Sequence, residues 1–282
     1  MLVLLFVQAA AAAAGATDME AIVATRCGPK LPVLALESVP KPEASSLQPT
    51  QVMVEVVASS VNPVDWKILG CGTQFPTRTG WDLAGRVVAV GSGCQRLKAG
   101  DEVWADIAPT FGAFAEFVVV EEQQLGLAPR NLALQDAATL PLVGMTTLAA
   151  FGLTDARGVP AETWRQKPVA LVLGGTGGCG SVGIQLAKAL GASHVYATGS
   201  DVQYMQRLGA DTAWDYRTTD WWVALADNSV DVIYDTVGVS GDADRGMKKL
   251  RVGGKFVTIA GSTSLHPKPG VAQAAIHNCK FS

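Results

Sequence analysis

Residues 168–191 read PVALVLGGTGGCGSVGIQLAKALG: an apolar run, a glycine-rich loop and an amphipathic run without interruption. The apolar run predicts a buried β-strand, and the amphipathic run predicts an α-helix. Between them, the spacing GxGxxG suits a dinucleotide: Gly175 for a tight turn, Gly177 for backbone approach to a pyrophosphate, Gly180 for close packing. The free N–H groups at the start of the helix would then face the phosphates. The alternative is a purely structural glycine turn. The expected cofactor contacts are Gly175, Gly177, Gly178, Cys179 and Gly180.

The composition limits the possible functions. The 282 residues are enough for two domains or one large one, and a hydrophobic content of 49% can fill a core. The net charge of −3, without a basic cluster, argues against nucleic acid as a partner. The five cysteines are odd in number and scattered, which fits neither a disulfide framework nor a CxxC zinc site. We therefore expect incidental or buried thiols at Cys27, Cys71, Cys94, Cys179 and Cys279.

The first residues differ from the rest of the chain. Residues 1–16 read MLVLLFVQAAAAAAGA, an apolar core followed by small residues. This run is too short to span a bilayer, which takes about 20 residues. It resembles a signal peptide, although it has no basic side chain. Residues 1–18 are therefore expected to be a signal-peptide-like segment of a secretory protein. The alternative is that Met19 is the true start and the protein is cytoplasmic.

After this segment, the chain shows two different sequence patterns, one in each half. From Met19 to about residue 136, short apolar or alternating runs are separated by turn signals, which predicts a partly closed, barrel-like β domain. From residue 137 onward, apolar strand-like runs alternate with helical stretches. This alternation predicts a parallel, doubly wound α/β sheet. The expected strands of this sheet include Val169–Leu173, His194–Thr198, Val230–Asp235 and Lys255–Ala260.

Several separate motifs occur together in the chain: NPVDWK at 62–67, GWDLAGRVVAVGSG at 80–93, KAGDEV at 98–103, GAFAEF at 112–117 and LPLVGMT at 140–146. In this order, with the glycine loop, they closely resemble the medium-chain dehydrogenase/reductase superfamily. The match is to its zinc-independent quinone oxidoreductase branch, which is zeta-crystallin-like and includes enoyl reductases. The resemblance implies a GroES-like catalytic domain over 19–136 and a Rossmann domain over 137–282. Family members continue further, so the Rossmann domain is expected to be C-terminally truncated, in the protein or in its gene model.

The same resemblance argues against a metal. Zinc alcohol dehydrogenases of the superfamily have a metal-binding cysteine where Asn62 stands, and a His-Glu pair where Trp81 and Asp82 stand. Catalytic zinc needs about three protein ligands and an open position. We therefore expect no zinc. Without a Lewis acid, a quinone or an α,β-unsaturated carbonyl is the easier hydride acceptor.

The resemblance implies a substrate cleft near the Asn62–Lys67 loop. Asn62 is a candidate donor to a substrate carbonyl, or it simply forms the turn with Pro63. Asp65 is a candidate proton donor, or it caps the helix that Trp66 begins. A lysine such as Lys67 is more often solvated or bound to a cofactor phosphate than an acid.

The cofactor is expected to be NADPH rather than NADH. NAD-binding strands usually end in an acid that holds the ribose 2′-hydroxyl, whereas residues 197–200 read ATGS. Ser200 is expected to contact a 2′-phosphate and to form a capping box with Gln203. The resemblance implies that Tyr216 lines the phosphate pocket. It also implies nicotinamide contacts for Thr146, Val237, Ile259 and Ala260.

Two functions remain open at this level. The first is an NADPH-dependent, zinc-independent oxidoreductase of quinones or enones. The second is a non-catalytic NADPH-binding protein that has lost turnover with its C-terminal segment. The expected partner is a small-molecule quinone or enone. No nucleic-acid partner and no transmembrane span are expected, and a homodimer is possible because relatives often dimerise through the cofactor domain.

Overall fold

The computed structural model describes residues 4–5, 17–28, 33–67, 69, 74–154 and 158–276. The chain divides into two compact units, Leu2–Leu142 and Val143–Ser282. Most of the signal-peptide-like segment lies outside the described residues, as do Cys71 and Cys279. Over the part of the chain that is described, no helix has both the length and the apolar character needed to cross a membrane.

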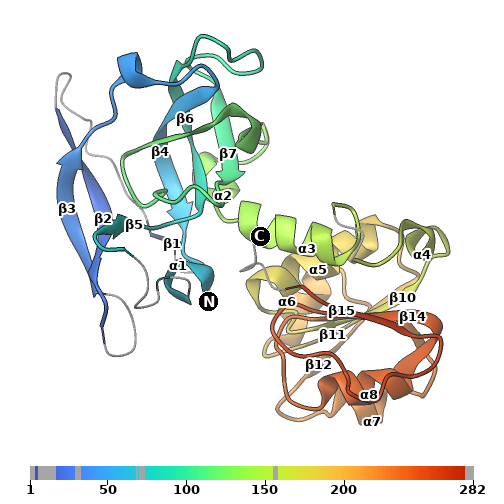
Figure 1. The fold of residues 1–282 in the computed structure, drawn as a ribbon. Helices are drawn as coiled ribbons and strands as arrows, with labels where there is room; N and C mark the ends of the chain where they lie inside the picture. The colour runs from blue at the N-terminus through green and yellow to red at the C-terminus, as the bar shows by residue number, and fades with distance from the viewer. Residues whose placement is uncertain are drawn as a thin grey trace. The chain divides into compact units, whose positions relative to one another are not determined.

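The N-terminal unit is built on antiparallel strands (Figure 1). In its six-stranded sheet, β4 pairs with both β6 and β8. Val52, Val54 and Val56 of β4 are fully buried in the core of this sheet, as side-chain alternation along a strand requires. The strands are β1 (Leu4–Leu5), β4 (Gln51–Ser60), β6 (Asp82–Val90), β7 (Glu102–Asp106), β8 (Phe117–Glu121) and β9 (Gly126–Leu127).

A three-stranded sheet in the order β3-β2-β5 completes this unit. Met19 and Ala21 of β2 share a small core with Met53 and Phe117 of the larger sheet. The prediction of a β-rich, GroES-like domain is confirmed. The remaining elements of this unit are β2 (Asp18–Arg26), β3 (Val33–Pro40), β5 (Thr77–Arg78), α1 (Val64–Lys67), α2 (Leu134–Ala137) and the 3-10 turns η1 (Ala44–Ser46) and η2 (Glu122–Gln124).

The C-terminal unit is a parallel sheet in the order β12-β11-β10-β13-β14-β15 (Figure 1). All five pairs of neighbouring strands are parallel. This is the strand order of dinucleotide-binding folds, and it reverses between β10 and β13, where ligands bind at the carboxyl ends of the strands. β15 is the sixth strand of this sheet. The strands are β10 (Val169–Leu173), β11 (His194–Gly199), β12 (Thr212–Asp215), β13 (Val230–Asp235), β14 (Leu250–Thr258) and β15 (Ala272–Ala275).

Helices cover both faces of this sheet. Ala170 and Val172 of β10 belong to one core, which contains Ile184 of α5. Leu171 and Leu173 belong to a second core, which contains Trp221 and Met247 of α7 and α8. Because both faces of β10 are buried, its sequence is a continuous apolar run. The helices are α3 (Pro141–Ala150), α4 (Ala161–Arg165), α5 (Gly178–Ala189), α6 (Val202–Arg207), α7 (Trp221–Ala224) and α8 (Asp242–Lys249).

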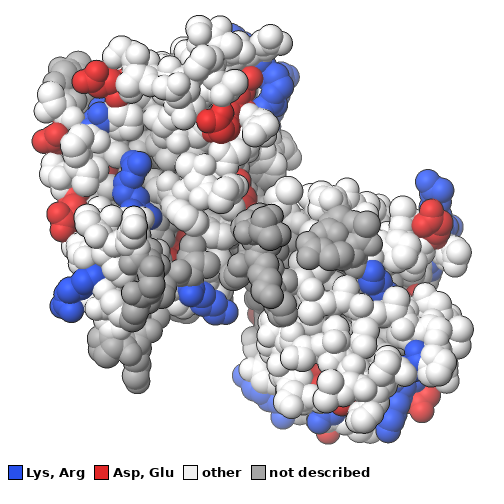
Figure 2. Space-filling model, viewed as in Figure 1, with Lys and Arg blue, Asp and Glu red and all other residues white. Residues whose placement is uncertain are grey.

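The surface and the thiols add two observations. On the face drawn in Figure 2, acidic and basic side chains are interspersed on both units. Cys27 is disulfide-bonded, so the expectation of an incidental thiol is wrong at this position. An odd number of scattered cysteines can still contain one pair, and counting them could not reveal it. Cys94 and Cys179 are not disulfide-bonded, as expected.

Candidate functional site

The glycine loop joins β10 to α5 at the carboxyl edge of the parallel sheet. Gly174 has a φ of +85°, a left-handed conformation that strongly favours glycine. Gly174 thus has the left-handed conformation, and Gly175 lies inside the turn that the Gly177 N–H closes on the Gly174 carbonyl at 2.9 Å. The backbone N–H groups of Gly174 and Gly175 donate to the Thr198 carbonyl at 3.0 and 2.7 Å, which fixes the loop against β11.

Close packing explains why residues 175 and 180 are glycines. A Cβ on Gly175 would lie 2.8 Å from both Ile184 Cδ1 and Met205 Sδ. A Cβ on Gly180 would lie only 2.1 Å from the Gly174 carbonyl oxygen. Gly177, the N-cap of α5, has more room, since its Cβ would meet nothing closer than 3.3 Å. The loop thus brings the first turn of α5 to the edge of the sheet, and the start of a helix suits a pyrophosphate.

The loops after β13 and β14 are tied together by Asp235, which the sequence did not single out. This buried carboxylate accepts hydrogen bonds from the backbone N–H groups of Val237 and Gly238 at 3.0 and 2.9 Å. Its other oxygen accepts from Thr258 Oγ1 at 2.8 Å, and Thr258 Oγ1 accepts from Gly261 N at 2.9 Å. The candidate nicotinamide contacts Val237, Ile259 and Ala260 lie in these two loops.

The end of β11 differs from the expectation at one point. Asp201, not Ser200, is the N-cap of α6, and its side chain accepts from Tyr204 N at 2.8 Å. The expected capping box of Ser200 with Gln203 is therefore wrong, because the carboxylate one residue later takes the cap. The Ser200 hydroxyl instead lies 3.4 Å from Thr176 Oγ1 of the glycine loop. The Ser200 side chain therefore does not cap α6, and it lies at the carboxyl end of β11.

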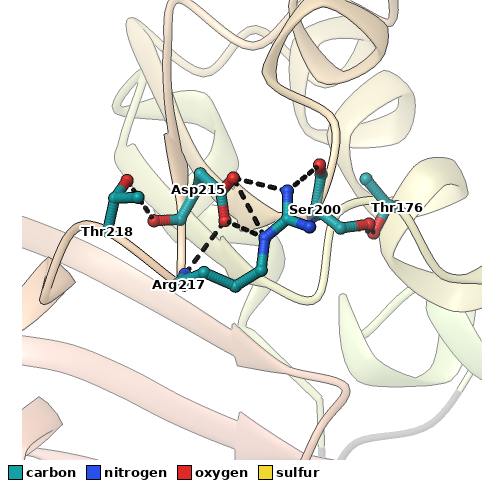
Figure 3. Close-up of polar contacts among 5 residues, drawn as sticks. All are labelled: Thr176, Ser200, Asp215, Arg217 and Thr218. Carbon is teal, nitrogen blue, oxygen red and sulfur yellow. Dashed lines mark hydrogen bonds and ion pairs between the residues drawn. The ribbon is translucent and has the colours of Figure 1, made fainter.

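Arg217 completes a polar cluster at this edge, drawn in Figure 3. Its guanidinium donates to the Ser200 carbonyl at 3.0 Å and to Asp215 Oδ2 at 2.6 Å. Hydrogen bonds from Arg217 lower the pKa of Asp215 to about 2. The neighbouring Tyr216 is exposed. Arg217 and Thr176 were missed, although an arginine directly after a predicted pocket tyrosine was the available signal.

Thr146 and Thr147 lie side by side in α3. Thr146 is buried, with 4% of its surface exposed. Thr147 is also buried, and its hydroxyl donates to the Val143 carbonyl at 2.8 Å and lies 3.4 Å from the Cys179 carbonyl oxygen and 3.3 Å from the Tyr234 hydroxyl. Thr147 therefore contacts the first turn of α5, a contact that the sequence did not reveal.

In the N-terminal unit, Asn62 and Asp82 form a buried network. The Asn62 amide donates to Ser60 Oγ at 3.1 Å and to Asp82 Oδ2 at 2.8 Å. Asp82 also accepts from Ser60 Oγ at 2.5 Å and from Leu142 N at 2.7 Å. Burial raises the pKa of Asp82 to about 7, against the effect of these hydrogen bonds. Both amide hydrogens of Asn62 thus have protein acceptors.

Asp65 lies beside this network, within α1. Its Oδ2 accepts from Asn62 N at 2.6 Å, and its Oδ1 is buried. Burial raises the pKa of Asp65 to about 6, the backbone N–H groups of Asn62 and Trp81 oppose this, and the Asp106 carboxylate adds to it. A buried carboxyl of this kind can exchange a proton near neutral pH.

The positions of the zinc ligands in related enzymes were predicted to hold no metal here. Asn62 and Asp82 are hydrogen-bonded to each other, and Trp81 is buried with its ring 5.5 Å from that of Phe111. Within the described ranges, no group of three or more His, Cys, Asp or Glu side chains is placed to hold a metal ion.

Comparison with known proteins agrees with this architecture. The family model of the alcohol dehydrogenase GroES-like domain matches residues 48–130, and that of the zinc-binding dehydrogenases matches residues 178–279. A solved quinone oxidoreductase from Coxiella burnetii is similar over 86% of this chain and 75% of its own, with a TM-score of 0.72 and 29% identity.

Curated relatives are similar over most of the chain. A 2-methylene-furan-3-one reductase of Solanum lycopersicum is 38% identical over 82% of this chain. A chloroplastic NADPH-dependent alkenal/one oxidoreductase of Arabidopsis thaliana is also 38% identical over 82% of this chain. The match spans 60% of the length of each relative. The chain belongs to the medium-chain dehydrogenase/reductase superfamily, in the branch of the quinone oxidoreductases.

Proposed function

We propose that the protein is an NADPH-dependent oxidoreductase that transfers hydride to a quinone or an α,β-unsaturated carbonyl without zinc. The observation that carries this proposal is the cluster of Thr176, Ser200 and Arg217 beside the glycine loop. It offers hydroxyls and a guanidinium where an NAD-binding protein has an acid for the ribose 2′-hydroxyl. The names of the tomato and Arabidopsis relatives, a reductase and an NADPH-dependent oxidoreductase, support the same interpretation.

The cofactor is held by groups that converge on the carboxyl edge of the parallel sheet. The first turn of α5 binds the pyrophosphate through backbone N–H groups at Gly178, Cys179 and Gly180. Arg217 and Ser200 bind the 2′-phosphate, and a guanidinium suits a phosphate because several N–H donors act together. Tyr216 lies next to Arg217 and can cover the adenosine end.

The nicotinamide end is held by the loops that Asp235 organises. When bound, NADPH supplies the hydride, and the chain must position it and complete the reaction with a proton. Asp235 fixes the backbone at Val237 and Gly238, and Thr258 fixes Ala260 and Gly261. Such fixed backbone groups orient a ring without reorganising during the reaction. Thr146 contacts the same end of the cofactor.

We propose that Asp65 donates the proton that completes the reduction of the substrate. Reduction of an enone places negative charge on the substrate, which a proton then neutralises. Asp65 is buried, and burial raises its pKa to about 6. A carboxyl with such a pKa suits a general acid at near-neutral pH. Asn62 holds the Asp65 carboxylate through its backbone N–H and anchors the loop through its amide.

Zinc independence is supported by the donor set at Asn62, Trp81 and Asp82. An amide and an indole are not zinc ligands of the usual kind, and one carboxylate is fewer than the three protein ligands that catalytic zinc needs. Asp82 already accepts hydrogen bonds from Ser60, Asn62 and Leu142. A hydrogen-bond network thus replaces the metal in holding this loop.

The test is oxidation of NADPH, followed by absorbance, with trans-2-hexenal and with 1,4-benzoquinone after treatment with a chelator. We expect turnover with at least one acceptor, a preference for NADPH over NADH, and no loss on chelation. Turnover abolished by chelation and restored by zinc would contradict the metal-free mechanism. NADPH binding without turnover of any enone or quinone would instead favour a non-catalytic NADPH-binding protein.

A further inference from the structure

Arg78 is a cation inside the N-terminal unit that the proposed reaction does not use. It lies on β5, where it pairs with Val23 of β2. Its side chain is half-buried, and its stem lies against Gly112, because a Cβ built there would be 3.5 Å from Arg78 Nε. Gly112 has a φ of +116°, so its own backbone conformation strongly favours glycine and keeps this space open to Arg78.

The guanidinium of Arg78 makes no hydrogen bond and no ion pair with any of the described residues. Burial alone lowers its pKa, and no carboxylate opposes that effect. Four other arginines, Arg86, Arg217, Arg245 and Arg251, each have a carboxylate oxygen within 2.6–3.0 Å. A partly desolvated guanidinium with no anion is costly, so its five donors are suited to a ligand.

Arg78 borders a cavity of about 460 Å³. This volume lies in the range of small-molecule sites. The cavity is lined by Val23, Val39, Pro40, Pro42, Pro76, Thr77 and Arg78. Apart from the guanidinium and the Thr77 hydroxyl, the lining side chains are aliphatic or proline rings. Lys41, between two of these prolines, has its Nζ 3.8 Å from the centre of the Phe117 ring and adds a second positive charge nearby.

We propose that this cavity binds a small apolar molecule carrying one carboxylate, with the carboxylate on Arg78. The single cation of the lining matches one negative charge, and a guanidinium can hold both oxygens of a carboxylate at once. The proline and valine walls take the apolar part of the ligand. The site lies on β2, β3 and β5, and it does not depend on the proposed hydride transfer.

The test uses octanoate as the probe and octan-1-ol as its uncharged counterpart, titrated calorimetrically into the full chain. Octanoate is expected to bind the native protein more tightly than octanol does. Arg78→Met is expected to weaken octanoate binding about ten-fold or more, the loss of a charge-assisted contact, and to leave octanol binding unchanged. Arg86→Met is the matched control, because Arg86 lies on the same unit but pairs with Glu102 at the surface.

A second variant tests the cavity without changing the charge. Val39→Phe fills part of the space and is expected to weaken both octanoate and octanol while circular dichroism stays native. Octanoate binding that survives both Arg78→Met and Val39→Phe would overturn the proposal. So would a native protein that binds octanoate no more tightly than octanol. Should Arg78→Met fail to fold, Arg78→Lys and Val39→Phe decide the question, since the lysine is expected to retain part of the preference for octanoate.

Discussion

At the scale of single residues, the guanidinium of Arg217 lies beside the Ser200 backbone and holds Asp215 ionised. Asp215 has its pKa lowered to about 2 by hydrogen bonds from Arg217, and it is negatively charged across the physiological range. Without Arg217, that carboxylate would face an incoming 2′-phosphate unshielded. In the proposed function, the same side chain attracts the phosphate and neutralises the group that would repel it.

We predict that Arg217→Met raises the KM for NADPH about ten-fold or more while changing the KM for NADH little. One lost charge-assisted hydrogen bond is enough for this change. Steady-state kinetics with both cofactors checks it. Arg251→Met is the control, because Arg251 pairs with Asp231 in the same unit. Equal losses with both cofactors in Arg217→Met would mean that the arginine has no part in choosing between them.

Asp65 gives a second prediction at this scale. A general acid must carry its proton, and the pKa of Asp65 is raised to about 6. The kcat of the native enzyme is therefore expected to fall as the pH rises through about 6 toward 8. Asp65→Asn is expected to lower kcat by about 100-fold and to remove this decline. A variant with the native pH profile would show that the proton comes from another source.

At the scale of elements, the first turn of α5 packs closely against the glycine loop, where Gly180 faces the Gly174 carbonyl. The Cβ of an alanine there would lie 2.1 Å from that oxygen, so α5 or the loop must move. We predict that Gly180→Ala destabilises the protein by roughly 1–3 kcal/mol and weakens NADPH binding. Chemical denaturation and cofactor titration measure the two effects.

Gly144→Ala is the matched control. Gly144 lies inside α3, and a Cβ there meets nothing within 4 Å. Alanine in a helix interior is favoured over glycine by up to about 1 kcal/mol, so this variant is expected to be neutral or more stable. If both alanine variants behaved alike, the close contact at Gly180 would not be the cause.

Asp82 links three elements, since its carboxylate accepts from Ser60 at the end of β4, from the Asn62 turn and from Leu142 in α3. Its pKa rises from 3.8 to about 7 on folding, because of burial. Between these values the folded protein keeps a proton that the unfolded chain releases. The stability contributed by this group is therefore full below 3.8 and falls as the pH rises toward 7.

We predict that Asp82→Asn removes this part of the pH dependence. The asparagine does not titrate, so its unfolding free energy should change less between about pH 5 and pH 8 than that of the native chain. The variant should also be less stable, because its amide N–H₂ must face one of the three donors. Denaturant unfolding at the two pH values provides the comparison. Parallel curves for both proteins would show that Asp82 does not titrate in this range.

At the scale of the whole molecule, the sequence predicted the architecture well. The strands Val169–Leu173 and Val230–Asp235 were placed at their observed ends, because buried parallel strands are unbroken apolar runs. Contacts over long sequence separations could not be predicted. Asp235 meets Thr258 at a separation of 23 residues, and Arg217 meets Ser200 at a separation of 17.

The predictions that failed for single residues did so for a different reason. The pattern Ser-x-x-Gln at residue 200 fits a capping box, but the carboxylate of Asp201 is a competing cap one residue away. The spacing GxGxxG likewise does not reveal which glycine has a positive φ, and that residue is Gly174, just before the motif. In both places two adjacent residues could take the same role, as a helix cap or as a turn glycine. Only the conformation of the folded backbone shows which residue takes it.

The most direct test of metal-free hydride transfer follows the hydride itself. NADPH carrying deuterium at the transferable position is incubated with trans-2-hexenal and the chelator-treated protein, and the product is analysed by mass spectrometry. Hydride transfer without a metal predicts a saturated aldehyde with one deuterium at the β carbon. A saturated product without deuterium, or bound NADPH with no saturated product, would contradict it.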